Sequence, residues 1–135
     1  MGRGQEERKM KLSVITPERK LVVDREVEEV RLPTPAGYIG LLPHHFPVMG
    51  ILGVGILSFG GEKIAVEGGF FRFEKETLEV LAKMAWKPEE LSRKQLKEEK
   101  EKALQILRTS SDPQEVERAA YRFSRASAFL TLFQD

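Results

Sequence analysis

Residues 54–66, VGILSFGGEKIAV, contain two β-rich runs separated by a pair of glycines. A two-residue connection of this kind favours a β-hairpin, because both of its central residues adopt positive φ angles that glycine tolerates without strain. The runs Val54–Phe59 and Lys63–Val66 are therefore predicted to pair through Gly60 and Gly61. This hairpin is the starting point for a sheet.

Short runs of the same character lie on both sides of the hairpin and are separated by turn residues. They are Leu12–Thr16, Lys20–Val23, Val27–Leu32, Tyr38–Leu42, Phe70–Phe73 and Leu78–Leu81. Many short strands at this spacing predict an antiparallel β sandwich or barrel. Between Val27 and Val30 the alternation slips by one residue, as a β-bulge would require.

The glycines divide the chain. All 11 lie at or before Gly69, and the last 66 residues contain none. Glycine suits turns and costs about 1 kcal/mol inside a helix, so a turn-rich β module is followed by a helical one. We expect an α+β chain of two modules: a disordered tail or alternative start over residues 1–9, a β sandwich over residues 10–86, and an antiparallel two-helix hairpin over residues 87–135.

The helical module contains two helix signals. Pro88 suits the first position of a helix that is expected to continue to about Arg108. The residues Asp112-Pro113-Gln114-Glu115 indicate a capping box that starts a second helix. The predicted apolar face of this second helix consists of Val116, Ala119, Ala120, Phe123, Ser127 and Leu130.

Composition excludes several classes of function. The chain has 22 Lys and Arg against 21 Asp and Glu, a net charge of +1, so no overall field attracts nucleic acid, and we expect no nucleic-acid partner. Zero cysteines exclude disulfides and thiolate chemistry. No apolar run approaches the ~20 residues of a membrane span, so direct membrane insertion is not expected.

Catalytic and metal-binding patterns are weak. His44 and His45 are the only histidines, and neighbouring side chains of this kind do not converge on one metal ion, so a turn between Pro43 and Pro47 is the favoured interpretation. No glycine pair is followed by lysine at the spacing of a phosphate-binding loop. We expect no catalytic residue, no metal and no cofactor.

A basic stripe marks the second predicted helix. Arg118, Arg122 and Arg125 fall within about 60° of one another on a helical projection, roughly opposite the apolar face. Guanidinium groups bind carboxylates in a bidentate manner, so an acidic protein surface is the favoured partner. Phe129 and Leu132 continue toward the arginine side, and the helix end is expected to expose apolar surface to a partner or a refolded tail.

One segment carries a family resemblance. Residues 37–48, GYIGLLPHHFPV, resemble a motif of the epsilon subunit family of bacterial and chloroplast F-type ATP synthases, whose mitochondrial counterpart is called delta. The matching sheet positions are Gly37, Gly40, Pro43, His45, Pro47 and, further along the chain, the pair Gly68 and Gly69 before Phe70. The order of the two modules agrees as well, and the resemblance extends from about Met10 to the end of the chain.

The resemblance implies a non-catalytic central-stalk subunit, which couples proton-driven rotation of the c-subunit ring to ATP synthesis. Its implied partners are the gamma subunit and the c-ring, with a ring-facing loop formed by Tyr38, Leu42, His44 and His45. The implied location is peripheral, on the cytoplasmic face of the plasma membrane, within the ATP synthase complex.

The resemblance also implies a regulatory hairpin. Its second helix would meet the catalytic alpha and beta subunits, with Arg118, Arg122 and Arg125 facing acidic residues of beta and inhibiting ATP hydrolysis. Some members bind ATP through a motif that aligns with residues 91–96. Here Leu91 is retained, but Ser92 replaces the aspartate and Gln95 replaces the arginine, so weak or absent ATP binding is expected.

Two other readings stay open on the residues alone. The chain could be a free β-sandwich adaptor whose helical hairpin binds an acidic protein in a groove. It could also be an enzyme built on a β-barrel, if folding brings distant side chains together.

Overall fold

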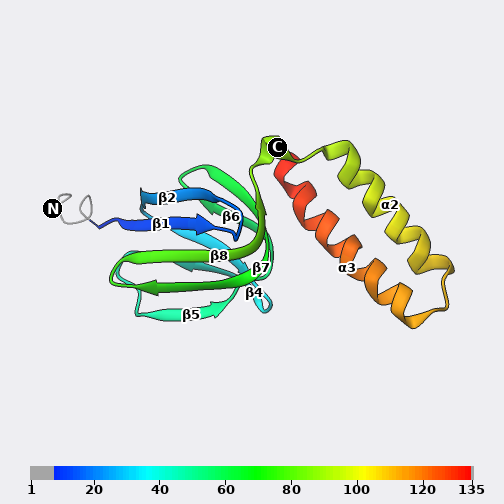
Figure 1. Cartoon of the computed structure of the whole chain (residues 1–135), viewed down its shortest axis with the longest axis horizontal. Helices are drawn as coiled ribbons and strands as arrows, with labels where there is room; N and C mark the ends of the chain where they lie inside the picture. Colours follow the sequence, from blue (N-terminus) through cyan, green and yellow to red (C-terminus); the bar gives the residue numbers. More distant parts are fainter. Residues whose placement is uncertain (1–7, 135) are drawn as a thin grey trace. The chain divides into compact units, whose positions relative to one another are not determined.

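The structure is a computed structural model that describes residues 8–134 (Figure 1). The strands are β1 (Met10–Ile15), β2 (Lys20–Val27), β3 (Val30–Thr34), β4 (Gly37–Leu41), β5 (Val48–Ile51), β6 (Val54–Phe59), β7 (Glu62–Glu74) and β8 (Thr77–Trp86). The helical elements are η1 (Pro88–Glu90), α2 (Arg93–Thr109), α3 (Pro113–Leu130) and η2 (Thr131–Phe133). The chain separates into two compact units between Lys87 and Pro88. Most of the expected tail over residues 1–9 lies outside the described residues.

The strands form a β sandwich in the order β2-β1-β8-β7-β6-β3-β4, with β5 paired to β7. The predicted fold class, a β sandwich followed by a helical hairpin, is confirmed. One detail of the prediction is wrong, because β1 and β8 run parallel whereas the other pairs are antiparallel. The chain between β1 and β8 contains six other strands, a connection long enough to return a strand in the same direction.

The predicted hairpin at Gly60 and Gly61 is confirmed, with φ angles of 53° and 84° and the register Phe59 opposite Glu62. The expected bulge between Val27 and Val30 is wrong. Both valines are buried, and the two residues between them connect β2 to β3. A short connection between two strands and a bulge within one strand interrupt the apolar alternation in the same way, and only the pairing of the strands distinguishes them.

The two runs expected at Lys63–Val66 and Phe70–Phe73 are parts of one 13-residue strand, β7. Its first half pairs with β6 and its second half with β5, while β8 follows it on the other side. The change of partner occurs at Gly68 and Gly69, whose φ angles are 72° and 115°. A Cβ atom on Gly69 would lie 2.1 Å from the carbonyl oxygen of Leu81, so this position is restricted to glycine.

The core of the β unit lies between its layers and consists of alternating side chains from most strands. Its largest fully buried members include Met10, Leu12, Leu32, Leu41, Leu52, Leu57, Phe73 and Leu78. The side chains between them on each strand face outward, as the two-residue period of a strand requires. Functional residues on the sheet are therefore found among the outward-facing positions.

The first helix begins later than predicted. Pro88 starts the single 3₁₀ turn η1, and α2 begins after Ser92, whose hydroxyl accepts a hydrogen bond from the Gln95 N–H at 3.2 Å. Serine at the N-cap supplies this acceptor, which explains the start at Arg93. No helix of the described residues is long and apolar enough to cross a membrane.

The second helix begins as predicted, with Pro113 at its first position and the Asp112 side chain accepting from the Gln114 N–H at 3.0 Å. The reciprocal half of the capping box is altered. Glu115 accepts a hydrogen bond from the Ser110 hydroxyl, and Ser110 in turn accepts from the Asp112 N–H at 3.1 Å. Ser110 thus bridges Asp112 and Glu115, the two ends of the capping box, with one hydrogen bond to each.

The buried face of α3 is rotated from the predicted one. Its buried residues are Ala119, Ala126 and Phe129, whereas Ala120 is exposed. Leu96 and Ala103 are the buried residues of α2. The buried face is rotated toward the arginine side of α3, since Phe129, predicted on that side, is buried, whereas Ala120, predicted on the apolar face, is exposed.

Candidate functional site

The predicted ring-facing residues lie at two ends of one strand. Tyr38 is the second residue of β4, whereas Leu42, His44 and His45 follow its last residue. A strand rises about 3.3 Å per residue, so the length of β4 separates the two groups. All four side chains are exposed. The expectation that they form one contiguous loop is therefore wrong.

Tyr38 is held on the sheet by its hydroxyl. The Ile56 backbone N–H donates a hydrogen bond to it at 2.9 Å, and the Arg31 guanidinium lies 5.2 Å from the centre of its ring. Gly55 provides the space, because a Cβ there would be 2.5 Å from the Tyr38 oxygen. Tyr38 is 45% exposed, so it contributes both to the sheet and to the molecular surface.

His45 organises the turn after β4. Its Nδ1 lies 2.7 Å from the Phe46 carbonyl oxygen, and because a carbonyl can only accept, Nδ1 carries the proton. Its backbone N–H donates to the Leu42 carbonyl at 3.0 Å, and its ring meets the edge of Phe73 at 6.3 Å between centroids. The side chain is exposed, so it shapes the turn without being buried.

Backbone geometry accounts for some motif glycines and not for others. Gly37 has a φ of 129° at the end of the β3–β4 turn, where its carbonyl accepts a hydrogen bond from the Thr34 hydroxyl at 2.6 Å. At Gly40, by contrast, φ is not positive, and an added Cβ would only come within 3.4 Å of a Glu29 oxygen. Of the two motif prolines, Pro43 is buried and Pro47 is exposed.

An apolar row crosses the outer face of the sheet. Ile51 pairs with Phe70, Phe70 with Leu81, and Leu81 with Ile15, on β5, β7, β8 and β1. Directly paired residues project from the same face. Ile51 and Phe70 are exposed, and Leu81 and Ile15 are half-buried. Contiguous exposed apolar surface of this kind marks an interaction site.

Further apolar side chains extend this surface on β5 and just before it. Met49 is exposed two residues from Ile51, and Phe46 is 84% exposed. The sequence prediction missed the whole of β5, and with it this surface. The alternation of Val48 and Gly50 with Met49 and Ile51 is the signal that was available, but it extends over four residues only.

A pocket of about 380 Å³ adjoins the apolar row, and its lining is mainly apolar. It is formed by Ile15, Thr16, Pro17, Gly69, Phe70, Leu81, Ala82 and Lys83. On the other side of the row, an ion pair between Arg72 and Glu79 limits the apolar surface. The hydrogen bond and charge of Glu79 raise the pKa of Arg72, so the guanidinium stays ionised.

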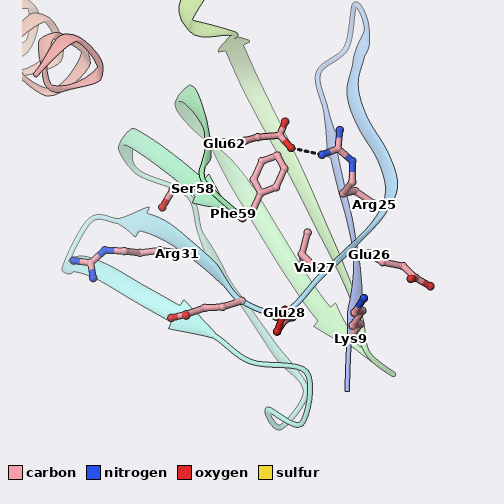
Figure 2. Close-up of a pocket in the computed structure, with 11 residues that line it drawn as sticks. Lys9, Arg25, Glu26, Val27, Glu28, Arg31, Ser58, Phe59 and Glu62 are labelled. Atoms are coloured by element: carbon pink, nitrogen blue, oxygen red, sulfur yellow. Dashed lines mark hydrogen bonds and ion pairs between the residues drawn. The ribbon is translucent and has the colours of Figure 1, made fainter. Parts of the chain in front are cut away.

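A second, polar pocket of about 540 Å³ opens between the β2–β3 connection and the β6–β7 hairpin (Figure 2). Arg25 forms an ion pair with Glu62 across it and lies 5.6 Å over the Phe59 ring. The lining includes both basic and acidic side chains, and residues 8–134 contain no group of three or more His, Asp or Glu side chains suited to a metal ion. Arg25 and Glu62 pair with each other, and the mixed charges of the lining do not define a ligand.

On α3, the three arginines do not form one exposed stripe. Arg118 and Arg122 are exposed, but the Arg125 side chain is 18% exposed and its guanidinium contacts Glu99 of α2 at 3.3 Å. Tyr121, which lies between Arg118 and Arg122 in the sequence, is also exposed, and the sequence analysis did not single it out. The rotation of the packed face brings Arg125 to the margin of the helix pair.

The expectation of apolar surface at the end of α3 is also corrected in part. Phe129 is completely buried, and Leu132 is half-buried in η2. The three residues aligned with the ATP motif lie at the start of α2: Leu91 is half-buried, Ser92 is the N-cap and Gln95 is exposed. Ser92 therefore has a structural role at this position, as the N-cap of α2.

Comparison with known proteins places these features in a family. Residues 9–88 match the family described as ATP synthase, Delta/Epsilon chain, beta-sandwich domain. The chain is 44% identical over 86 residues to the ATP synthase epsilon chain of Solibacter usitatus, a match that covers 61% of this chain and 63% of that one. It thus spans less than two thirds of that relative's length.

Longer matches include both modules. The ATP synthase epsilon chain of Desulforamulus reducens is 33% identical over 120 residues, which cover 86% of this chain and 90% of that one. The chloroplastic epsilon chain of Cyanidioschyzon merolae is 32% identical over 108 residues, with 77% and 82% covered.

Two solved structures share the fold. A chain of the Euglena gracilis mitochondrial ATP synthase, solved with OSCP, F1 and the c-ring, has a TM-score of 0.84 at 18% identity and covers 93% of this chain and 82% of that one. A chain from the Tetrahymena thermophila central stalk and c-ring has a TM-score of 0.61 at 15% identity, with 92% and 96% covered. The family model, which matches residues 9–88, and the relatives that match both modules show that the chain belongs to the delta/epsilon chain family of ATP synthases.

Proposed function

We propose that this protein is a non-catalytic central-stalk subunit of an F-type ATP synthase, which transmits rotation of the c-ring to the catalytic subunits. Family membership supports the assignment. The related Euglena and Tetrahymena chains were solved in assemblies with a c-ring, which gives the partner class. The proposed location is peripheral, on the cytoplasmic face of the plasma membrane.

The observation that carries the proposal is the apolar row of Ile15, Ile51, Phe70 and Leu81. A sheet whose outer face exposes Phe70 and Ile51 needs a partner to remove that area from water, and we assign the face to the gamma subunit. The adjoining pocket would receive one apolar side chain of gamma. Burial of such an anchor is the usual source of most of the binding energy in an interface.

The c-ring would contact the exposed residues around β4. Because Tyr38 and the group Leu42, His44 and His45 lie at opposite ends of that strand, we assign the ring contact to one of the two groups and not to both. Leu42 and the two histidines are the better candidates for the ring contact, since the Tyr38 hydroxyl is already hydrogen-bonded to the sheet through the Ile56 N–H.

The hairpin would control ATP hydrolysis through the alpha and beta subunits. Arg118 and Arg122 are exposed on α3, where carboxylates of beta can reach them. Tyr121, between them in the sequence and also exposed, adds an aromatic side chain of the kind enriched at interface hot spots.

Co-purification tests the rotor assignment. A chain with Phe70→Asp is expected to lose gamma and c subunits under mild detergent extraction, because a carboxylate would be buried in the interface. Val23→Asp, which alters an exposed apolar residue on β2 outside the row, is the matched control and should retain both. Absence of gamma and c from the unaltered chain would overturn the proposed function.

A further inference from the structure

Three side chains of β8 project from the face of the sheet that carries the apolar row. Glu79, Leu81 and Lys83 are two residues apart, and a strand places such residues on one face. On β7, Arg72 pairs with Glu79 and Phe70 pairs with Leu81. The first pair is an ion pair and the second is apolar, so each side chain has a neighbour of matching chemistry. Lys83 is the next position in this series, and there the matching ends.

The residue opposite Lys83 is a glycine. The register of β7 and β8 places Gly68 across from Lys83, so no side chain of β7 is available to pair with the ammonium. A Cβ atom on Gly68 would lie 3.3 Å from Cδ of Lys83 and 3.8 Å from its Cε. The aliphatic part of Lys83 therefore lies over the glycine, while the residue as a whole is exposed. This contact supports the side chain and leaves its charge at the surface.

Positive charge is in excess at this end of the apolar row. Within residues 8–134, Lys83 forms no ion pair. Lys20, which is paired with Ile15 at the end of the row, is a second exposed cation. Glu18 of the adjoining turn lines a different pocket, together with Arg19. The surface around this end of the row is therefore complementary to a negatively charged partner.

The pocket of about 380 Å³ brings Lys83 next to apolar surface. Of the described residues that line this pocket, Lys83 alone is charged. The hydroxyl of Thr16, another polar group of the lining, is used inside its own turn, where it accepts a hydrogen bond from the Arg19 N–H at 3.1 Å. An incoming group thus meets mainly apolar walls and one ammonium group.

We propose that this pocket and Lys83 together recognise a segment of the gamma subunit in which an apolar side chain has a carboxylate beside it. The apolar side chain enters the pocket, and the carboxylate pairs with Nζ of Lys83. The proposal rests on the proposed function, which assigns this face to gamma. Phe70 and Leu81 supply the apolar contact area, whereas Lys83 determines which segment is accepted.

A carboxylate suits this position better than a neutral or basic group. When a partner covers the face, the Lys83 ammonium loses part of its hydration, and that loss is offset only by an opposite charge or a hydrogen-bond acceptor. A basic residue at the same place would be repelled by Lys83 and Lys20 together. An apolar anchor alone fits many pockets, so the charge beside the pocket is what excludes the wrong segment or register.

Binding measurements with charge variants test the proposal. The full chain is titrated against a complex of alpha, beta and gamma that lacks this subunit, at low and at high salt. Lys83→Gln is expected to raise the dissociation constant about two- to fivefold at low salt and to weaken its salt dependence. Lys83→Glu should raise it about tenfold or more, because two carboxylates would then face each other. Lys83→Arg should bind like the unaltered chain.

The matched control is Lys63→Gln. Lys63 is also an exposed lysine of β7 and β8, but it lies on β7 outside both the pocket and the apolar row, and its replacement should leave the affinity unchanged. Thermal unfolding of each variant checks that the β unit remains folded.

Carbodiimide coupling locates the partner carboxylate. The reagent joins a lysine amine to a carboxylate in contact with it, so the assembled complex should yield a peptide containing Lys83 linked to an Asp or Glu of gamma. Lys83→Arg has no primary amine at this position and should lose that product while it keeps its affinity. Coupling of Lys83 to another subunit would overturn the choice of partner.

The outcomes separate this inference from the rotor assignment. If Lys83→Gln and Lys63→Gln bind equally well and Lys83 is not coupled to gamma, while Phe70→Asp abolishes binding, the recognition of a carboxylate is refuted and the assignment of this face to gamma stands. If the unaltered chain does not bind the complex, both are refuted.

Discussion

The Tyr38 hydroxyl accepts a hydrogen bond from the backbone N–H of Ile56 at 2.9 Å. This contact joins β4 to β6 across β3, close to the point where β3 and β6 pair through Arg31 and Ser58. The absence of a side chain at Gly55 makes the approach possible. A side chain thus satisfies a strand N–H that would otherwise need a backbone partner or water.

Removing this hydroxyl tests how much the sheet depends on it. Tyr38→Phe is expected to lower the free energy of unfolding by about 1 to 2 kcal/mol, because a partly buried N–H loses its acceptor while the ring stays in place. Urea denaturation followed by circular dichroism measures the change. Unaltered stability would mean that water replaces the hydroxyl and that Tyr38 serves the surface alone.

Gly68 and Gly69, the glycine corner where β7 changes its pairing partner, give a sharper contrast. Gly69→Ala is expected to destabilise the chain by about 2 kcal/mol or more, because its φ is positive and its Cβ would overlap the Leu81 carbonyl oxygen. Gly40→Ala, in which the added Cβ meets no such obstacle, should change stability by less than about 1 kcal/mol in either direction. Equal losses in the two variants, measured by thermal unfolding, would contradict this reading of the corner.

The local part of the β unit could be predicted from sequence. The hairpin at Gly60 and Gly61 depends on two adjacent residues, so the signal is complete within the run itself. Strand β5 was missed because it is four residues long and pairs with residues 70–73, some twenty positions away. The apolar row depends on that pairing, and no single stretch of the sequence contains it.

The helical unit shows a similar division. The capping residues located the start of α3 to the residue, because Asp112 and Pro113 act locally. The rotation of its buried face is set by what α2 offers, namely Ala103 and Leu96, and a helical projection of α3 alone does not contain that information. For this reason Arg125 was grouped with two exposed arginines.

A buried hydroxyl weakens α3. The oxygen of Ser127 is buried and has no hydrogen-bond partner in the structure. Ser127→Ala is expected to raise the free energy of unfolding by about 1 to 2 kcal/mol, since the unsatisfied group disappears and alanine favours the helix. The exposed Ser124→Ala gains helix propensity alone and should give about 0.5 kcal/mol or less. A chemical denaturation series compares the two, and an equal gain would show that the Ser127 hydroxyl is hydrated.

ATP binding by the hairpin is expected to be weak or absent. The family motif requires an aspartate and an arginine, and Ser92 and Gln95 stand in their places, a loss of about 1.5 to 3 kcal/mol for each charged hydrogen bond. Isothermal titration with ATP and magnesium measures the affinity directly. The variant Ser92→Asp with Gln95→Arg is the comparison, because aspartate also serves as an N-cap and leaves the start of α2 intact. Micromolar affinity of the unaltered chain would refute the prediction.

Removal of the hairpin tests its regulatory role, and the structure fixes where the cut belongs. Trp86 pairs with Ala65 at the end of β8, so a chain that ends at Ala85 loses part of the sheet, whereas one that ends at Lys87 keeps all of β8. The chain ending at Lys87 is expected to raise ATP hydrolysis by the assembled complex while gamma stays bound. Arg118→Ala combined with Arg122→Ala should also raise the rate of ATP hydrolysis, although the hairpin is present, because the carboxylates of beta would lose their exposed guanidinium partners.

If hydrolysis rises on truncation but not in the double variant, inhibition depends on the bulk of the hairpin and not on its charges. If neither change raises it, the hairpin has no inhibitory role in this complex, and the docking of the sheet through Phe70 and Ile51 is unaffected.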